Sequence, residues 1–549
     1  MNPLRVVGRK NLKAKKKKNL LLKRKLDKKH LTLKNQTKKN KLFFNQKLIF
    51  IFFLLLLTFL FKLGKKEKNK ENNNKITFNI NNKISRYLKY EEEFKNKNSF
   101  CDEVDPIFLY KQRTDRGPII ICSGEKSKHI CYQNPYNNSY NNVFVHKNGT
   151  ICIMENIILD PSHSRQTGRS YDRGPTDFSN RGTPLLDKGF FNAQCKLNDS
   201  ISLKIDKIYN TYFDSWNYEY DIKNEGENLE ELAPGKTVFF MSRNQDSPNL
   251  FHGYSDIVNA LVLIYLFNLD PEEIQVVFLE SMDIPYYKEE NSENKDLPRD
   301  PFYDIYKKMI GRGGEPIYIK NLKKKYKITK AFHVPLNWDS PLFINIPLPK
   351  CESITKTYKF INDFADKYLD IKPYKDKFLS NNENLYYPEA VLKNHESNTK
   401  FDKIVTIQWR RVWPKKRRGQ QRVLNNGPQL ADKLASVLPK NILVRLIDTA
   451  QFTMEEQISI MRSTDYLTGL HGAGLTLSMF LPTNSIYHEF HIYDFTSVLG
   501  IVSNLSGHKS YVDKVKNTVN NINGNQMVSF EEDDFANRIL QRMKENNFF

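Results

Sequence analysis

The segment Tyr466–His491 contains the residue pattern with the clearest chemistry in this sequence. An apolar run ends at His471, and Gly472-Ala473-Gly474 follows directly. Glycines carry no side chain, so backbone N–H groups can approach a ligand, and a helix that starts after them favours an anion such as a diphosphate. The pattern predicts an anion site formed by His471, Gly472, Ala473 and Gly474. A turn that only permits tight packing is an equally common alternative.

Two arginines and a carboxylate are further candidates for the same site. Arg410 and Arg411 follow the strand-like run 404–409, and guanidinium groups beside a strand end suit bidentate contacts to phosphate. Glu489 ends the next strand-like run after the glycines, where it could accept hydrogen bonds from ribose hydroxyls or remain a solvated carboxylate. The basic cluster 415–418 is more typical of a solvated loop.

His252 and Asp256 form a third candidate group, four residues apart in the segment before an expected helix. Residues at this spacing share a helix face. A histidine there could take a proton from a hydroxyl group while a carboxylate orients it. The alternative is a structural histidine with an aspartate that caps the helix.

Alternating strands and helices must position these residues, which predicts an α/β fold with two Rossmann-like halves. We expect the helix 256–267 to be capped by Ser255, and residues 374–399 to be an irregular linker. A capping-box pattern at Ser529 and Glu532 predicts a last helix. The other expected strands are 238–241, 275–279, 315–319, 328–334, 442–447, 466–470 and 485–490, and the other expected helices are 354–369, 428–438 and 454–462.

The charge is concentrated at the N-terminus. The chain of 549 residues has 85 Lys+Arg and 62 Asp+Glu, a net charge of +23. Residues 1–75 account for +21 of it, which leaves +2 for the rest of the chain. A nearly neutral body argues against a nucleic-acid-binding protein, and the 12% aromatic content argues against disorder.

An apolar run at Leu48–Phe61 follows this basic arm and predicts a membrane anchor. Residues 42–63 are long enough to span a bilayer if the flanking lysines reach the headgroups. A cleaved signal peptide and a buried core helix are the alternatives; the flanks are basic and no small-residue cleavage site follows. The excess of Lys and Arg before the run places the N-terminus in the cytosol, which is type II topology.

The six cysteines lie after the predicted anchor and fit an oxidising lumen with up to three disulfides. Four sequons for N-glycosylation, at Asn137, Asn148, Asn198 and Asn504, are consistent with that compartment. The predicted organisation is a cytosolic arm (1–47), a transmembrane signal anchor (48–63), a stem (64–100), a Cys-containing Rossmann-like acceptor domain (101–395) and a second Rossmann-like domain with a closing helix (396–549).

These motifs together resemble glycosyltransferase family 61. The HGAGL-T…FLP…E stretch from His471 to Glu489 is similar to the family's most characteristic block, and the arginine pair and the N-x-F-H-x-x-x-D segment at Asn249–Asp256 follow the family's order. The segments 185–197 and, less closely, 213–221 are similar to the branch that adds O-linked N-acetylglucosamine to extracellular EGF-like domains.

The resemblance implies a GT-B fold, in which two Rossmann-like domains face a cleft that holds a nucleotide-sugar donor. It also implies inverting transfer from a UDP-sugar, UDP-GlcNAc or UDP-xylose, to a hydroxyl of a glycoprotein or glycan. The donor would be bound by Arg410, Arg411, His471, Gly472, Ala473, Gly474 and Glu489. The catalytic base would be His252, or Asp256 if the histidine only positions the acceptor.

Some features depart from the family pattern. Leu477 stands where many members carry Asn, and the predicted anchor without a retrieval tail indicates the Golgi membrane rather than a soluble protein of the endoplasmic reticulum. Glu219-Tyr220-Asp221 only approximates a D-x-D motif, so a divalent metal is not clearly required. A membrane-anchored, carbohydrate-binding pseudo-transferase without turnover is the competing interpretation.

Overall fold

The computed structural model describes most of the chain after residue 99. The predicted arm, anchor and stem, the basic cluster 415–418 and the sequons at Asn137 and Asn148 lie outside the described residues. None of the described helices is long and apolar enough to cross a membrane. The described residues are 100–132, 144–145, 150–165, 185–198, 212, 214–221, 229–242, 250–279, 302–335, 344–345, 350–351, 353–372, 374, 379–411, 422–492, 497–522 and 525–549.

The first half of the fold is built on a mixed sheet in the order β12-β11-β10-β13-β4-β2-β1-β8. The strands from β12 to β13 are parallel, and the strands beyond β13 are antiparallel. The Cys-containing segment therefore extends the same sheet. The strands are β1 (Ile119–Ser123), β2 (Lys128–Tyr132), β4 (Ile151–Leu159), β8 (Lys196–Leu197), β10 (Thr237–Met241), β11 (Ile274–Phe278), β12 (Ile317–Tyr318) and β13 (Tyr326–His333), with β7 (Phe191–Asn192) beside β4 and β9 (Trp216–Asn217) beside β7.

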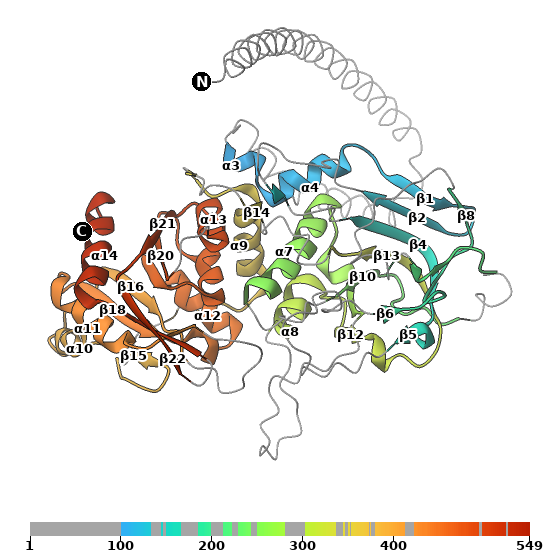
Figure 1. Ribbon diagram of the computed structural model, residues 1–549. Helices are drawn as coiled ribbons and strands as arrows, with labels where there is room; N and C mark the ends of the chain where they lie inside the picture. The colour runs from blue at the N-terminus through green and yellow to red at the C-terminus, as the bar shows by residue number, and fades with distance from the viewer. Residues whose placement is uncertain are drawn as a thin grey trace, which may run out of the picture. The chain divides into compact units, whose positions relative to one another are not determined.

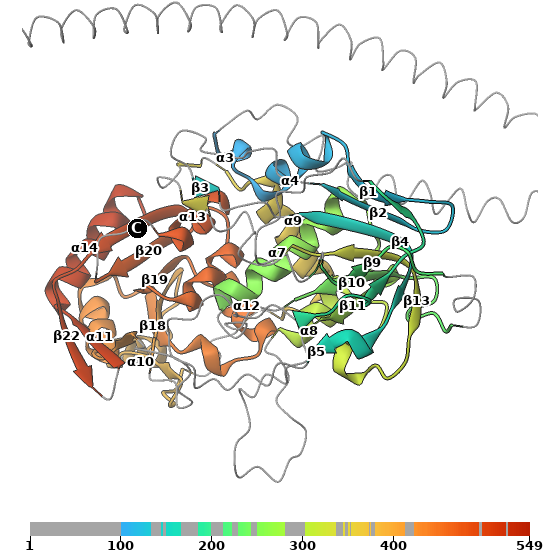
Figure 2. The ribbon, with the colours of Figure 1, turned by 45° about the vertical axis from the view of Figure 1, so that its right-hand side comes forward.

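Helix α7 (Leu250–Leu266) is the central helix of this half. Every residue from Phe251 to Tyr265 is buried, so the helix is covered on all sides and lies in the middle of the core. Figures 1 and 2 show α7 and α9 (Lys356–Tyr368) between the two sheets. The remaining elements of this half are α3 (Phe100–Glu103), α4 (Pro106–Thr114), β3 (Phe144–Val145), η2 (Pro161–His163), β5 (Ser164–Arg165), β6 (Leu185–Leu186), η4 (Pro271–Glu273), α8 (Tyr303–Ile305), η6 (Tyr306–Ile310), η7 (Ile319–Asn321) and β14 (Ile344–Asn345).

The second half is built on a six-stranded sheet in the order β15-β18-β16-β19-β20-β21. All neighbours are parallel except β15 and β18. Strands β18, β19 and β20 are buried along their whole length, as is typical of a parallel sheet covered on both faces. The strands are β15 (Leu385–Tyr386), β16 (Lys403–Gln408), β18 (Ile442–Ile447), β19 (Tyr466–Leu470), β20 (Ile486–His491) and β21 (Lys509–Lys514).

Helices cover this sheet, and a small second sheet lies beside it in the order β17-β23-β22. One continuous cluster of buried apolar residues extends from α4 in the first half to α14 in the second, so the two halves share a core. The elements are α10 (Glu389–Glu396), β17 (Arg422–Leu424), α11 (Gly427–Val437), η10 (Thr449–Gln451), α12 (Met454–Arg462), η11 (Ala473–Phe480), α13 (Val498–Leu505), β22 (Asn517–Ile522), β23 (Asn525–Phe530) and α14 (Glu532–Glu545).

All six cysteines form disulfides, which reaches the expected limit of three bridges and gives the pairing that the sequence left open: Cys101–Cys351, Cys122–Cys195 and Cys131–Cys152. The sequon at Asn504 is different from the expectation. Asn504 is buried in α13 and donates a hydrogen bond to the carbonyl of Gly500, so its side chain is not accessible for glycosylation in the folded protein. Asn198 is exposed.

Three local predictions were wrong. Helix α7 begins at Leu250 rather than at residue 256, and the hydroxyl of Ser255 bonds to the carbonyl of Phe251 inside the helix instead of capping it. The expected linker 374–399 contains β15 and α10, both of which join the second half. The last helix, α14, is capped by Glu531 rather than by Ser529.

Candidate functional site

The carboxyl ends of three neighbouring parallel strands bring the main candidates together. Gln408 at the end of β16 is in register with Gly469 of β19, which is in register with Glu489 of β20. The residues that follow these positions, Arg410 and His471, therefore lie at one edge of the sheet. In open α/β sheets this is the edge where ligands bind.

Arg410 is largely enclosed at this edge. One of its terminal nitrogens, Nη1, donates a 2.5 Å hydrogen bond to the carbonyl of His471. Burial lowers the pKa of the Arg410 guanidinium to about 9, and the nearby positive charge of Arg422 acts in the same direction. Within the described part of the chain no carboxylate forms a salt bridge with it. A partly buried guanidinium with no carboxylate partner among the described residues is suited to an anionic ligand.

Position 472 has room only for glycine, because the Arg410 side chain lies directly against it. A Cβ atom added to it would overlap Nη1 of Arg410 and lie 2.8 Å from its Cζ atom. Gly472 also precedes the 3₁₀ helix η11, whose first internal bond joins the N–H of Leu475 to the carbonyl of Gly472 at 3.0 Å. The preceding N–H groups, of Ala473 and Gly474, are at the positive end of this helix. The site thus has two kinds of hydrogen-bond donor for an anion: the guanidinium of Arg410 and the backbone N–H groups of Ala473 and Gly474.

Arg411 is placed differently from Arg410. Its Nε atom is 3.0 Å from a carboxylate oxygen of Asp448, and Nη2 is 2.8 Å from the side-chain oxygen of Asn384. These bonds join the loop after β16 to the end of β18 and to the segment before β15. Arg411 therefore holds the loop that carries Arg410 in place. Its predicted contact with phosphate stays a prediction.

Glu489 is also placed differently from the expectation. Its side chain is fully buried and accepts hydrogen bonds from four side chains. These donors are Tyr487, His491, Ser497 and His471. Burial alone would raise the pKa of the Glu489 carboxyl, but the bonds from His471 and His491 outweigh it and lower the pKa. The carboxylate faces the protein, so this arrangement does not offer the ribose contact that the sequence suggested.

Sequence reasoning missed three of these donors. Tyr487, Glu489 and His491 alternate along β20 and so lie on one face of the strand. This alternation of polar residues along an expected strand was visible in the sequence and could have indicated that the three side chains lie together. Ser497 caps helix α13, and only the tertiary fold brings its hydroxyl to Glu489, so no local sequence pattern indicates this bond.

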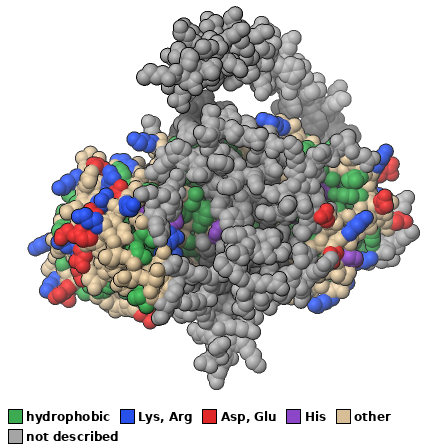
Figure 3. All heavy atoms as spheres, in the orientation of Figure 1, with side chains coloured by type: hydrophobic (Ala, Val, Ile, Leu, Met, Phe, Trp, Pro, Cys, Tyr) green, Lys and Arg blue, Asp and Glu red, His purple; other side chains and the backbone are tan. Residues whose placement is uncertain are grey.

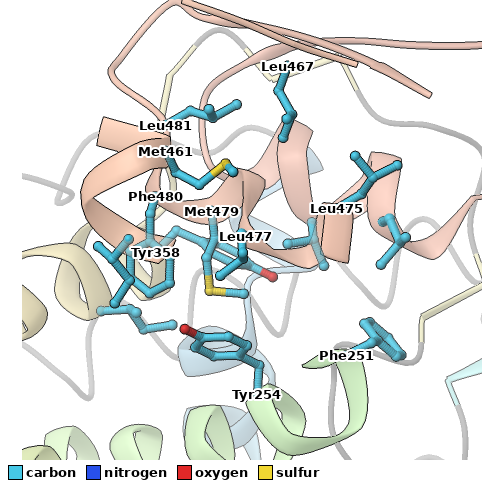
Figure 4. Close-up of a cluster of buried hydrophobic side chains, with 14 of the residues drawn as sticks. Phe251, Tyr254, Tyr358, Met461, Leu467, Leu475, Leu477, Met479, Phe480 and Leu481 are labelled. Carbon is cyan, nitrogen blue, oxygen red and sulfur yellow. The ribbon is translucent and has the colours of Figure 1, made fainter. Parts of the chain in front are cut away.

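His252 and Asp256 both lie in the first two turns of α7, where their side chains are buried. Helix α7 packs against η11, which begins next to the glycine turn. Figure 4 shows Phe251 facing Leu475 across this contact, while Tyr254 lies nearer Met479 and Phe480. The beginning of α7 is thus on the same side of the contact as the beginning of η11. Figure 3 shows histidine side chains next to apolar side chains at the junction between the halves.

Two groups of potential metal ligands occur among the described residues. In the first, Cys131 and Cys152 are joined in a disulfide and are not available as thiolates. The second consists of His471, Glu489 and His491, whose ligand atoms lie within 4.8 Å of one another.

Comparison with known proteins supports one family. The family model for glycosyltransferase 61 matches residues 318–487, a range that begins in the first sheet and includes Arg410 and the glycine turn. His252 and Asp256 precede the match, and Glu489 follows it. No curated protein matches the chain. The matched segment runs from β12 through Arg410 and Gly472 into β20, and over this segment the chain is similar to glycosyltransferase family 61.

Proposed function

We propose that this protein is a membrane glycosyltransferase that transfers GlcNAc or xylose from a UDP-sugar to a hydroxyl of a glycoprotein or glycan, with inversion. One observation carries the proposal: the enclosed Arg410 guanidinium, which has no carboxylate partner among the described residues, lies against the Gly472 turn at the carboxyl edge of the sheet. A diphosphate supplies the negative charge that this arrangement lacks. We further propose that the two halves form a GT-B arrangement with the acceptor between them.

In the proposed reaction an acceptor hydroxyl attacks the anomeric carbon of the donor sugar as the bond to UDP breaks. Negative charge develops on the leaving diphosphate, where Arg410 and the N–H groups of Ala473 and Gly474 stabilise it. Donors held in place before the reaction contribute several kcal/mol to such a step. A metal ion is not needed for this stabilisation.

The candidate base lies on the other half of the fold. His252 takes the proton of the acceptor hydroxyl, or Asp256 does so while His252 positions the acceptor. Because α7 packs against η11, both residues belong to an element that contacts the diphosphate half. Support comes from this placement and from the resemblance of the Asn249–Asp256 segment to the family.

The proposal is tested by assaying the full-length protein, purified in detergent, for turnover of UDP-GlcNAc and of UDP-xylose. We expect one donor to be turned over and Arg410→Ala to lower that rate about 100-fold. Arg538→Ala is the matched control, because Arg538 pairs with Asp534 on helix α14. A folded wild-type protein that turns over neither donor would favour the carbohydrate-binding pseudo-transferase.

We also propose that the enzyme is a single-pass type II protein of the Golgi membrane with its catalytic part in the lumen. The apolar run at residues 48–63 with its basic flank supports this topology, and three disulfides support an oxidising compartment. Protease protection on sealed microsomes tests the topology. Cleavage of the catalytic part without detergent would contradict it.

A further inference from the structure

Gln408, the last residue of β16, fills the space beside two glycines. It is in register with Gly469 of β19, where an added Cβ atom would lie 2.9 Å from the Cβ of Gln408. An added Cβ on Gly474 would lie 3.1 Å from both Cδ and Nε2 of the same side chain. Gln408 is only 7% exposed. One buried side chain thus extends from the end of β16 to the turn after β19.

Thr449, in the loop after β18, holds the amide of this side chain. Gln408 Nε2 donates a 2.9 Å hydrogen bond to the hydroxyl oxygen of Thr449, and the same hydroxyl donates to Gln408 Oε1 at 3.2 Å. Thr449 is itself buried. Because one hydroxyl engages both polar atoms of the amide, rotation of the amide group is restricted.

The loop that carries Thr449 is fixed by hydrogen bonds of its own. The side chain of Asp448 accepts a 3.3 Å bond from the backbone N–H of Ala450 and a 3.0 Å bond from Nε of Arg411. Thr449 is the first residue of the 3₁₀ helix η10. The support for the Gln408 amide therefore comes from a well-anchored segment at the end of the neighbouring strand.

Gln408 and Arg410 contact the glycine turn at two different residues. Arg410 lies against Gly472 and bonds to the carbonyl of His471, whereas Gln408 lies against Gly474. Two side chains that are two residues apart after β16 thus meet two glycines that are two residues apart in the turn. A glycine backbone is conformationally permissive, so such a turn depends on contacts of this kind to keep one conformation.

The same turn carries the backbone donors of the proposed diphosphate site. The first internal bond of η11 joins the N–H of Leu475 to the carbonyl of Gly472, and the N–H groups of Ala473 and Gly474 precede it. A hydrogen bond weakens steeply when its angle falls. The conformation of the turn therefore determines how well these two N–H groups bind an anion.

We propose that Gln408, held by Thr449, is a positioning residue that fixes the turn from Gly472 to Gly474 for diphosphate binding. The inference rests on the proposed function and deepens it. Gln408 acts through its contact with Gly474 and does not need to touch the ligand. Packing alone would be satisfied by an apolar side chain of the same length, which would not bury a polar amide.

The test is the affinity of the full-length protein, purified in detergent, for UDP and for inorganic pyrophosphate, measured by isothermal titration. Gln408→Met keeps the length of the side chain and removes the amide, and Thr449→Val keeps the shape of the side chain and removes the hydroxyl. Each should weaken the binding of both ligands about 10-fold, the effect of one lost hydrogen bond. The double variant should bind no more weakly than the single variants, because both substitutions remove the same bond. Thr449→Ser keeps the hydroxyl and should bind UDP within about twofold of the wild type.

Thr406 supplies a matched control on the same strand, two residues before Gln408. Its hydroxyl is 2.8 Å from that of Thr464 and accepts a 2.9 Å bond from Nε of Arg445, so it is another buried polar group with partners on neighbouring strands and loops. Thr406→Val should lower the melting temperature and leave the affinity for UDP unchanged. A role in stability alone predicts that same pattern for Gln408→Met and Thr449→Val. If circular dichroism shows that Gln408→Met does not fold, Thr449→Val carries the test, because it leaves Gln408 in place.

The possible outcomes separate the two proposals. If the wild type binds neither UDP nor UDP-sugars, the proposed function itself fails. If the wild type binds UDP and both Gln408→Met and Thr449→Val bind it with wild-type affinity, only the positioning role is refuted. If these variants weaken the binding of UDP but not that of pyrophosphate, Gln408 acts on the nucleoside and the inference is overturned.

Discussion

Gly472 is the single residue on which the placement of Arg410 depends most directly. Its backbone is extended, with φ of 176°, so alanine could adopt the same conformation. The added Cβ would nevertheless occupy the position of the Arg410 guanidinium. We expect Gly472→Ala to lower the rate of sugar transfer about 100-fold, similar to the removal of one donor from an oxyanion hole, without unfolding the protein. Donor turnover with a melting curve measures both effects.

Gly474→Ala is the matched comparison for that substitution. Its Cβ would meet the amide group of Gln408 at 3.1 Å, and the end of a flexible side chain can move by a few tenths of an ångström. A smaller loss of rate is therefore expected than for Gly472→Ala. Equal losses in the two variants would mean that the turn, rather than Arg410, carries the effect.

The sequence predicted the residues that meet at the carboxyl edge of the sheet better than the residues that support them. His471, Gly472 and Arg410 were found because glycines and arginines at strand ends have a direct chemical meaning. Arg411 and Glu489 have the same residue types, but Asp448 binds the first and four protein donors surround the second. Partners of this kind come from distant parts of the chain, so local spacing does not reveal them.

At the scale of elements, the contact between α7 and η11 joins the two halves of the proposed site. The hydroxyl of Tyr254 in α7 is 3.0 Å from the sulfur of Met454, and the centroid of its ring is 5.7 Å from that of Phe480. Tyr254→Ala would leave a cavity in this contact and cost about 3 to 5 kcal/mol of stability. We expect a lower melting temperature and a raised KM for the acceptor.

Tyr254→Phe distinguishes packing from polar contact in that experiment. Phenylalanine keeps the ring between the two halves and removes only the hydroxyl. A variant that behaves like wild type is expected, since a contact from a hydroxyl to a thioether is weak. If Tyr254→Ala melts at the wild-type temperature, α7 and η11 do not depend on this contact.

The regular elements of the second half were the most predictable part of the fold. Strands β18 and β19 and helix α12 have the bounds that hydrophobic pattern and flanking polar residues indicated. Helix α7 begins six residues before its predicted start, because it is buried on all sides and its first residues show no amphipathic pattern. The hairpin β22–β23 was not predicted, although an Asn-Gly pair separates its strands in the sequence.

At the scale of the whole molecule, the net charge is distributed unevenly along the chain, and most of it lies in the first 75 residues. The basic arm is the feature on which the predicted membrane topology depends. The rest of the chain has a net charge of +2, and its two halves share a core. Several histidines are buried in the described part of the chain outside the sheet edge that carries Arg410 and Gly472. His129 and His333 are in the first sheet and His508 follows α13, and each is at most 4% exposed.

These three histidines should make the fold sensitive to acid. Burial lowers the pKa of His129 and of His333 to about 3 and that of His508 to about 4. In the unfolded chain a histidine has a pKa of about 6.5. Between these values the unfolded state binds protons that the native state does not, so stability is complete above pH 6.5 and is lost as the pH falls. Each histidine contributes up to about 1.4 kcal/mol per pH unit.

The expected result is a lower apparent melting temperature at pH 5.5 than at pH 7.5, from a combined loss of up to roughly 4 kcal/mol. His129→Phe identifies the cause, because phenylalanine can keep the stacking on Trp216, where the ring centroids are 4.2 Å apart, and does not titrate. Loss of the bond to Tyr218 should lower the melting temperature of this variant at pH 7.5. The difference between the two pH values should nevertheless shrink by about a third, because one of the three protons is removed from the unfolded state. An unchanged difference would show that His129 does not carry this acid sensitivity.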